Sequence, residues 1–248
     1  MTDAAKLDTI DLEFRQNFRL PGGMPEIELV RGRTALVVID MQVLDAHRDG
    51  EFGRRARENG IEERTEWYFS RIETSVCPQI ARLLGSARSI GLDVVYTRIA
   101  SLTNDGRDLG WRYRHWGMTA RVDEKESEIL PEVAPADGEI VINKTTTSAF
   151  MGSHIDRILR NLGSETLIVC GVLTSGCVES TVRDAADAGY RVIVPEDATA
   201  ALSEQAHVNS INAMQPVFAT VTSTDLLLDR LDALRSEERV TVPPVSVP

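Results

Sequence analysis

Residues 166–197 read TLIVCGVLTSGCVESTVRDAADAGYRVIVPED and contain the pattern of a strand, a turn, a helix and a second strand in succession. The apolar runs at the two ends are short and nearly continuous in hydrophobicity, which is typical of strands buried on both faces of a parallel sheet. Between them Gly171 breaks the first strand, Thr174 and Ser175 are favourable helix N-cap residues, and residues 178–188 have helical spacing. The stretch therefore predicts a β–α–β unit.

The same alternation extends outward along most of the chain. Alternating strands and helices predict an α/β fold, in which a doubly wound, mostly parallel six-stranded sheet carries helices on both faces. The predicted strands are residues 35–40, 92–97, 139–143, 166–171, 191–196 and 217–222, and the predicted helices are residues 64–90, 154–162, 178–188, 204–214 and 224–234.

This predicted domain spans residues 34–236. Residues 1–33 are polar and broken by PGG at 21–23, so we expect an N-terminal arm that packs on the domain or on a neighbouring subunit, and we expect residues 237–248 to form an extended tail. Residues 101–126 fit the alternation poorly. Because compact domains contain few loops of that length, this segment is expected to be functional.

The composition limits the possible functions. The chain has 248 residues, of which 42% are hydrophobic, and its net charge is -11; this is typical of a soluble globular protein and disfavours nucleic acid as a partner. The N-terminus lacks the pattern of a signal peptide, and the apolar runs are too short to span a membrane. The cysteines Cys77, Cys170 and Cys177 lack the spacing of a zinc site or a disulfide framework, so we expect a cytoplasmic protein.

Three residues with reactive side chains stand at the ends of predicted strands. Asp40 ends the first strand, Lys144 follows the third, and Cys177 follows the fourth at the start of a predicted helix. Taken alone, Asp40 is explained by a turn or a cap and Lys144 by exposure to solvent. Because ligands of open parallel sheets bind beyond the carboxyl ends of the strands, we expect all three to share one cleft.

Cys177 is the candidate nucleophile of this group. At a helix N-terminus the unpaired backbone N–H groups and the helix dipole stabilise a thiolate, which predicts a pKa below the ordinary value of about 8.5. The same N–H groups can hold an oxyanion. Cys170 lies inside an apolar strand and is interpreted as a buried structural thiol.

Three motifs resemble those of one family, the isochorismatase-like cysteine hydrolases. They are TALVVIDMQ (34–42), INKTTTSAF (142–150) and GVLTSGCVESTVRDAADAGYRVIVPEDATAA (171–201). This family includes nicotinamidases and the amidohydrolases of N-carbamoylsarcosine, ureidoacrylate and biuret. The resemblance covers residues 33–222.

The resemblance implies a site and a reaction. Cys177 would be the nucleophile, Asp40 the general base and Lys144 the third member of a catalytic triad. A non-proline cis peptide would join Val172 to Leu173, and the backbone amides of Leu173 and Cys177 would form the oxyanion hole. The implied enzyme is an amidohydrolase that cleaves a C–N bond of a small amide, N-carbamoyl or ureide compound through a cysteine thioester, and it requires no cofactor.

Two alternatives remain open at this point. Nicotinamidases of this family add a metal site, but here the only candidate ligands after Asp40 are Asp45, His47 and Asp49, which we interpret as solvated side chains. We therefore predict no metal, although a metal-assisted, nicotinamidase-like deamidase is the second hypothesis. The third is a non-catalytic binding protein on the same scaffold.

Candidate substrate contacts come from several segments. Gln215 resembles a substrate-contacting glutamine of the biuret hydrolase type, and an amide side chain suits a urea-like group. In WRYRHWGM (111–118), Arg112 and Arg114 can bind a carboxylate, and a wall of the pocket can be formed by Trp111, Tyr113 or Trp116. The same residue types are also typical of subunit interfaces, and this family commonly forms oligomers, so a homo-dimer or homo-tetramer is expected. Thr174 and Phe150 complete the predicted substrate-binding residues.

Overall fold

A computed structural model describes residues 26–237, so most of the predicted arm (1–33) and nearly all of the predicted tail (237–248) lie outside the described residues. Its centre is a parallel sheet with the strand order β3-β2-β1-β4-β5-β7, and β6 pairs with β4. The strands are β1 (Thr34–Ile39), β2 (Asp93–Ile99), β3 (Ile140–Lys144), β4 (Thr166–Val172), β5 (Arg191–Pro195), β6 (Thr199–Ala200) and β7 (Thr220–Thr222).

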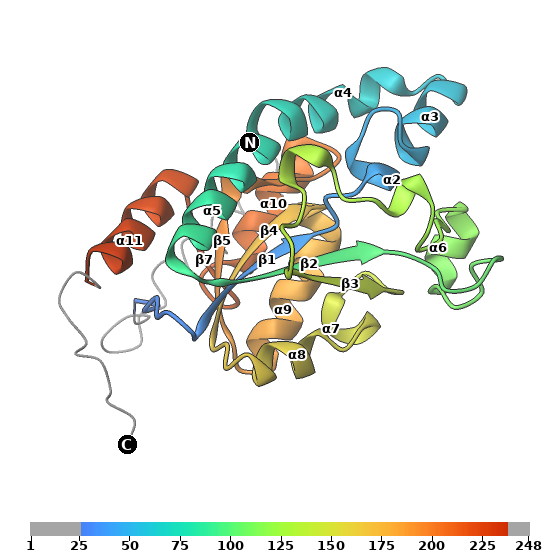
Figure 1. Cartoon of the computed structure of the whole chain (residues 1–248). Helices are drawn as coiled ribbons and strands as arrows, with labels where there is room; N and C mark the ends of the chain where they lie inside the picture. The colour runs from blue at the N-terminus through green and yellow to red at the C-terminus, as the bar shows by residue number, and fades with distance from the viewer. Residues whose placement is uncertain (1–25, 238–248) are drawn as a thin grey trace.

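Helices cover both faces of the sheet (Figure 1). Alternate residues of β1 point to opposite faces: Leu36 and Val38 join the core under α5 and α11, whereas Ala35 and Val37 join the core under α8, α9 and α10. The helices are α2 (Val43–Ala46), α3 (Glu51–Glu58), α4 (Glu62–Arg71), α5 (Cys77–Ile90), α6 (Trp111–Trp116), α7 (Ala149–Gly152), α8 (Ile155–Asn161), α9 (Glu179–Asp187), α10 (Glu204–Met214) and α11 (Thr224–Glu237). No helix within residues 26–237 is both long and apolar enough to cross a bilayer.

The predicted fold class is confirmed, with local differences. The helix predicted over 64–90 is divided into α4 and α5 by a π-helical turn, Ile72–Val76. The segment 101–126, predicted as a loop, contains the six-residue helix α6. Such short helices carry too little periodicity to be recognised from sequence.

The sheet has seven strands where six were predicted, because the two-residue strand β6 joins β4 near its carboxyl end. β5 pairs with the first residues of β4, up to Ile168, and β6 pairs with Gly171 and Val172. The neighbour of β4 on this side therefore changes from β5 to β6 toward the carboxyl end of β4, which divides the sheet there. A two-residue strand is too short to show a pattern of its own.

Gly171 is required where β4 passes β1 at this division. Its φ is +111°, and a Cβ atom there would lie 2.0 Å from the carbonyl oxygen of Ile39. Both strands are buried, so neither backbone can move aside without disturbing the core. The close approach holds the carboxyl ends of β1 and β4 together.

We expect Gly171→Ala to destabilise the protein by about 3 kcal/mol or more, because it adds a severe clash to an unfavourable φ. The measurement is the thermal midpoint of unfolding together with the yield of soluble protein. Gly85→Ala is the control, because that position in α5 has open space for a Cβ atom and should be neutral or stabilising. A Gly171→Ala variant as stable as wild type would contradict this account.

Candidate active site

The three side chains predicted to share a cleft do lie together. Asp40 follows β1, Lys144 ends β3 and Cys177 lies in the π-helical turn η4 (Thr174–Val178) after β4. The Nζ atom of Lys144 is 2.8 Å from Oδ2 of Asp40 and 3.3 Å from Sγ of Cys177. The side chains of Asp40 and Lys144 are fully buried, at 0% exposure. An ammonium group thus bridges a carboxylate and a sulfur in a site shielded from water.

Asp40 is held in an unusual backbone conformation. Its φ is +50°, in the left-handed region that residues other than glycine rarely adopt. The backbone N–H of Asp40 donates to the carbonyl oxygen of Thr97, and the Thr97 hydroxyl donates to Oδ1 at 2.9 Å. Gln42 secures the following turn, because its side-chain amide donates to the carbonyl oxygen of Ile99 and accepts from the Ile99 N–H. These contacts hold the Asp40 carboxylate beside Lys144.

Lys144 is enclosed by acceptors. Besides Asp40 and Cys177, its ammonium group lies 2.9 Å from the carbonyl oxygen of Thr146 and 3.1 Å from that of Thr147. Burial alone would lower the pKa of Lys144, but the negative charge of Asp40, together with the adjacent Cys177 sulfur, outweighs it and raises the pKa above its ordinary value. Lys144 is therefore a permanent cation at any physiological pH.

The protonation state of Cys177 differs from the prediction. Burial raises the pKa of its thiol to about 12; the charge of Lys144 opposes this shift, and Asp40 adds to it by its charge and a hydrogen bond. The expected lowering of the pKa by the helix N-terminus is therefore wrong. Desolvation penalises the thiolate more than the nearby positive charge favours it. The structure therefore places a thiol beside the ion pair of Asp40 and Lys144.

A chain of hydrogen bonds fixes the turn that carries Cys177. Arg71 of α4 lies 3.1 Å from Nε2 of His207, and Nδ1 of His207 lies 2.9 Å from the hydroxyl of Thr174. Burial lowers the pKa of His207 to about 4, so the ring is neutral. Because an arginine only donates, Nε2 is the acceptor and Nδ1 carries the proton toward Thr174. The Thr174 hydroxyl is thus engaged by His207. The peptide bond between Val172 and Leu173, just before this turn, is cis.

Tyr113 of α6 also reaches the site. Its hydroxyl lies 3.7 Å from Sγ of Cys177, and Nζ of Lys144 lies 6.0 Å from the centre of its ring. In the sequence Tyr113 was only one of several aromatic residues available as a pocket wall. Only 5% of the residues in the chain are aromatic, so the concentration of aromatic residues in 111–118 is the signal that marks this segment.

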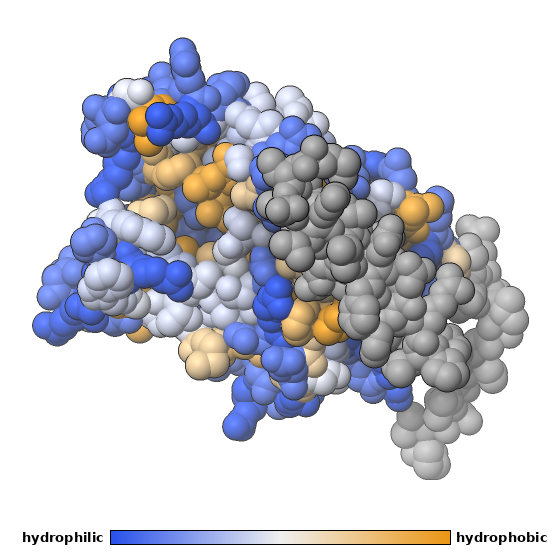
Figure 2. Space-filling model, turned by 180° about the vertical axis from the view of Figure 1, so that it is seen from behind, coloured by the Kyte–Doolittle hydropathy of each residue, from blue (hydrophilic) through white to orange (hydrophobic). Residues whose placement is uncertain are grey.

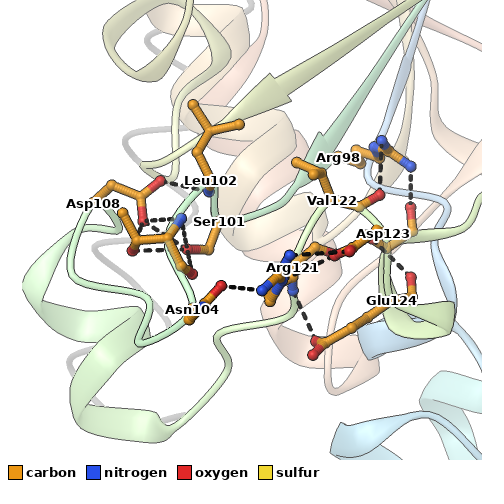
Figure 3. A network of polar contacts seen from close by, with 11 residues as sticks. Arg98, Ser101, Leu102, Asn104, Asp108, Arg121, Val122, Asp123 and Glu124 are labelled. Atoms are coloured by element: carbon orange, nitrogen blue, oxygen red, sulfur yellow. Dashed lines mark hydrogen bonds and ion pairs between the residues drawn. The ribbon is translucent and has the colours of Figure 1, made fainter.

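A polar network anchors the loop that carries Tyr113 (Figure 3). Asp108 accepts hydrogen bonds from the hydroxyls of Ser101 and Thr103, each at 2.6 Å, and from the backbone N–H of Leu102. Farther along, Arg121 forms an ion pair with Asp123 at 2.9 Å. The Asp108 bonds hold the first arm to residues 101–103, directly after β2, and Arg98 of β2 donates to the carbonyl oxygen of Val122 in the second arm at 3.3 Å. The position of α6 over the site is therefore fixed by the chain itself.

The remaining predicted contacts are more distant. Arg112 donates to the hydroxyl of Thr147, beside the carbonyl groups around Lys144, whereas Trp111 is 68% exposed and stacks on His115. Phe150 packs edge-on against Tyr190.

Gln215 follows the last residue of α10 and forms a cis peptide with Pro216. The residues after it, 216–220, line a pocket with Arg191 and Val192, which begin β5. Gln215 thus lies toward the amino end of the sheet, opposite the edge that carries Cys177, and the structure does not bring it to the cluster. The reason is that α10 runs back across the sheet from the edge where His207 lies.

Apolar residues form a cavity of about 350 Å³ next to the cluster. It lies between α3, α4 and the segment of α6, where Figure 2 shows a hollow with apolar side chains. Its lining residues are Asp45, Phe52, Arg55, Ala56, Asn59, Ile61, Tyr68, Trp116, Met118, Leu173 and Leu202. Leu173, at the cis peptide, connects this cavity to the turn of Cys177.

The candidate metal ligands do not converge. Asp45 is only 8% exposed, so its interpretation as a solvated side chain is wrong; the short helix α2, which the sequence did not reveal, turns it inward. Nδ1 of His47 accepts the backbone N–H of Asp49, and the Asp49 carboxylate pairs with Arg57. Within residues 26–237 no group of three or more His, Cys, Asp or Glu side chains is arranged to hold a metal ion.

Most of this chain is similar in sequence to known proteins. The family model described as the isochorismatase domain matches residues 34–225. N-carbamoylsarcosine amidase of Arthrobacter sp. is 33% identical over 174 residues, which are 68% of this chain and 66% of that protein. The chain thus spans slightly less than two thirds of that relative. Ureidoacrylate amidohydrolase of Variovorax paradoxus is 28% identical over 83% of this chain and 84% of its own length.

Solved structures extend the likeness to the fold. N-carbamoylsarcosine amidase of Thermoplasma acidophilum superposes with a TM-score of 0.60 at 27% identity, over 78% of this chain and 97% of that one. A cysteine hydrolase of Pseudomonas syringae pv. phaseolicola reaches a TM-score of 0.73 at 23% identity, over 87% of this chain and 100% of that one. The second likeness concerns the fold alone.

Proposed function

The chain belongs to the isochorismatase family, and on this premise we propose that it is a cysteine amidohydrolase, which cleaves a C–N bond of a small amide, N-carbamoyl or ureide compound. The observation that carries the proposal is the position of Lys144, whose Nζ lies 2.8 Å from the Asp40 carboxylate and 3.3 Å from the Cys177 sulfur. The relatives named above, an N-carbamoylsarcosine amidase and a ureidoacrylate amidohydrolase, support this class of substrate.

The reaction begins with proton transfer from the Cys177 thiol to the Asp40 carboxylate. Because the pKa of the thiol is raised to about 12, little thiolate exists beforehand, and the transfer accompanies attack of sulfur on the substrate carbonyl. The ammonium of Lys144 stabilises the negative charge as it passes between the two groups. The backbone amides of Leu173 and Cys177 are the proposed donors to the oxyanion of the tetrahedral intermediate.

Breakdown of the intermediate completes the first half. The C–N bond breaks, the leaving amine or ammonia takes the proton from Asp40, and a thioester to Cys177 remains. Asp40, ionised again, then takes a proton from water as that water attacks the thioester. The C–S bond breaks, and the proton returns to sulfur. Asp40 accepts and then releases each proton that is transferred, so the scheme requires no cofactor.

A thioester on Cys177 is the expected result when the reaction is stopped in acid during turnover. Release of ammonia from a panel of small amides, ureides and N-carbamoyl compounds identifies a substrate, and mass spectrometry of the acid-quenched enzyme then locates the adduct. We expect the added mass of the acyl group on the peptide that contains Cys177, with none on those that contain Cys77 or Cys170. Turnover without any adduct on Cys177, even under rapid quenching, would argue against covalent catalysis.

A further inference from the structure

Asp45 and Tyr68 place two unsatisfied polar atoms at the apolar cavity. Oδ1 of Asp45 and Oη of Tyr68 are buried and have no hydrogen-bond partner among residues 26–237. Asp45 is 8% exposed and Tyr68 is 0% exposed, yet both residues line the cavity. Buried polar groups without a partner are costly, and two of them at one cavity beside the reacting groups point to a ligand that hydrogen-bonds to them. The mechanism proposed above uses neither residue.

The two residues are close to the reacting groups. Both residues line one cavity together with Leu173, which directly precedes the turn that carries Cys177. Asp45 stands five positions after Asp40, in α2, whereas Tyr68 comes from α4. A molecule whose carbonyl reaches Cys177 would therefore extend past Asp45 into the cavity.

Asp45 is held as a neutral acid. Burial raises its pKa to about 8, the nearby Asp40 carboxylate adds to the shift, and Lys144 opposes it. A protonated carboxyl both donates and accepts a hydrogen bond, which matches the carbonyl and N–H of an amide or a urea. The titratable and charged groups around it are Asp40, Lys144, Cys177, Tyr68, the mutually paired Glu51, Arg54 and Arg55 of α3, and Glu126, which Arg54 binds.

The cavity offers little to a carboxylate. Arg55 is the one cation among its lining residues within 26–237, and it already pairs with Glu51 at 2.6 Å and binds the carbonyl oxygens of Trp116 and Gly117. Most other lining residues are apolar. An anionic substrate would lie beside the Asp40 carboxylate, and among the described residues no unpaired cation lines the cavity, which is unfavourable.

We propose that Asp45 and Tyr68 are specificity-determining residues, which bind an uncharged hydrogen-bonding group of the substrate at the inner end of the cavity. The enzyme therefore acts on neutral amides or ureides that carry an apolar substituent and discriminates against counterparts that carry a carboxylate. This inference rests on the proposed amidohydrolase function and narrows its substrate class. N-carbamoylsarcosine and ureidoacrylate, for which the two relatives are named, carry a carboxylate that this cavity does not match.

The first test compares matched substrates. N-alkylureas or alkyl amides are paired with compounds of equal length that end in a carboxylate, and kcat/KM is measured for both at pH 7. We expect the neutral member to be preferred by about tenfold or more, because the carboxylate loses its hydration without gaining a partner. Calorimetric titration of the Cys177→Ala variant with the same pairs measures this preference without turnover. Equal or better binding of the carboxylates would overturn the proposal.

The second test is the pH profile. Asp45 is neutral below its pKa of about 8 and ionised above it, so kcat/KM for a neutral substrate should fall as the pH rises through that value. Asp45→Asn keeps a neutral donor and acceptor and should abolish this decline. Asp49→Asn is the matched control, because Asp49 is exposed and paired with Arg57, and it should retain the wild-type profile. Tyr68→Phe should raise KM more than it lowers kcat.

The outcomes separate the two proposals. If the wild type forms the Cys177 thioester but Asp45→Asn keeps the alkaline decline, the assignment of Asp45 is wrong and the amidohydrolase function stands. If no thioester forms and alanine at position 177 retains turnover, the proposed function itself is wrong. Thermal midpoints for each variant distinguish a change in recognition from a loss of folding.

Discussion

Replacing Cys177 with alanine is expected to lower kcat/KM by about 10³-fold or more while leaving the protein folded. The variant keeps Asp40, Lys144 and the cavity, but it lacks the atom that forms the thioester, and a loss of this size is typical when a covalent nucleophile is removed. Loss of one buried sulfur should cost about 1 kcal/mol of stability. The measurements are ammonia release with the best substrate of the panel and the thermal midpoint of unfolding.

Cys77 provides the matched control for that variant. Like Cys177, Cys77 is 7% exposed. It lies at the start of α5, and burial raises the pKa of its thiol to about 12. Cys77→Ala therefore makes the same chemical change in a similar environment away from Lys144, and turnover should survive it. Near wild-type activity in Cys177→Ala, or an equal loss in Cys77→Ala, would refute the assigned nucleophile.

Lys144→Met is expected to impair both activity and stability. The methionine has a similar shape, but it leaves the fully buried Asp40 carboxylate without its cation, and breaking such a pair on one side costs about 3–5 kcal/mol. Turnover should fall by about 10²-fold or more, because no cation then stabilises the negative charge that passes between the Cys177 sulfur and Asp40. Thermal unfolding and steady-state kinetics measure the two effects.

A double variant separates the two roles of the pair. Asp40→Asn combined with Lys144→Met removes both charges, so much of the lost stability should return while activity stays low. The exposed pair of Arg33 and Glu165 is the control for ion pairs in general, and Arg33→Met should cost no more than about 1 kcal/mol. If Lys144→Met were as mild as this control, the structural importance of the buried pair would be disproved.

Much of the fold could be predicted from the sequence because buried parallel strands and their helices have strong patterns. The helix 204–214 is observed with the predicted bounds, and the six predicted strands all occur. The convergence of Asp40, Lys144 and Cys177 was also predictable, since the carboxyl ends of parallel strands meet at one edge. The order β3-β2-β1-β4 places the first and fourth of the predicted strands side by side.

Properties that depend on distant segments could not be predicted. The raised pKa of Cys177 reflects burial, which is caused in part by α6, a helix too short to recognise. Asp45 has the local sequence of a loop residue and is buried only because α2 turns it inward. Gln215 stands near a strand in the sequence, but the direction of α10 carries it to the other edge.

The reactive residues and the cavity wall come from different parts of the fold, which determines how substrate selectivity can change between homologues. Asp40, Lys144 and Cys177 are supplied by strand ends and the turn after β4, whereas most of the cavity wall is supplied by α3, α4 and the segment of α6. Grafting those covering segments from one homologue onto another should redirect which compounds are hydrolysed and leave the chemical step intact. The architecture thus lets selectivity evolve by exchange of peripheral segments above a constant reactive centre.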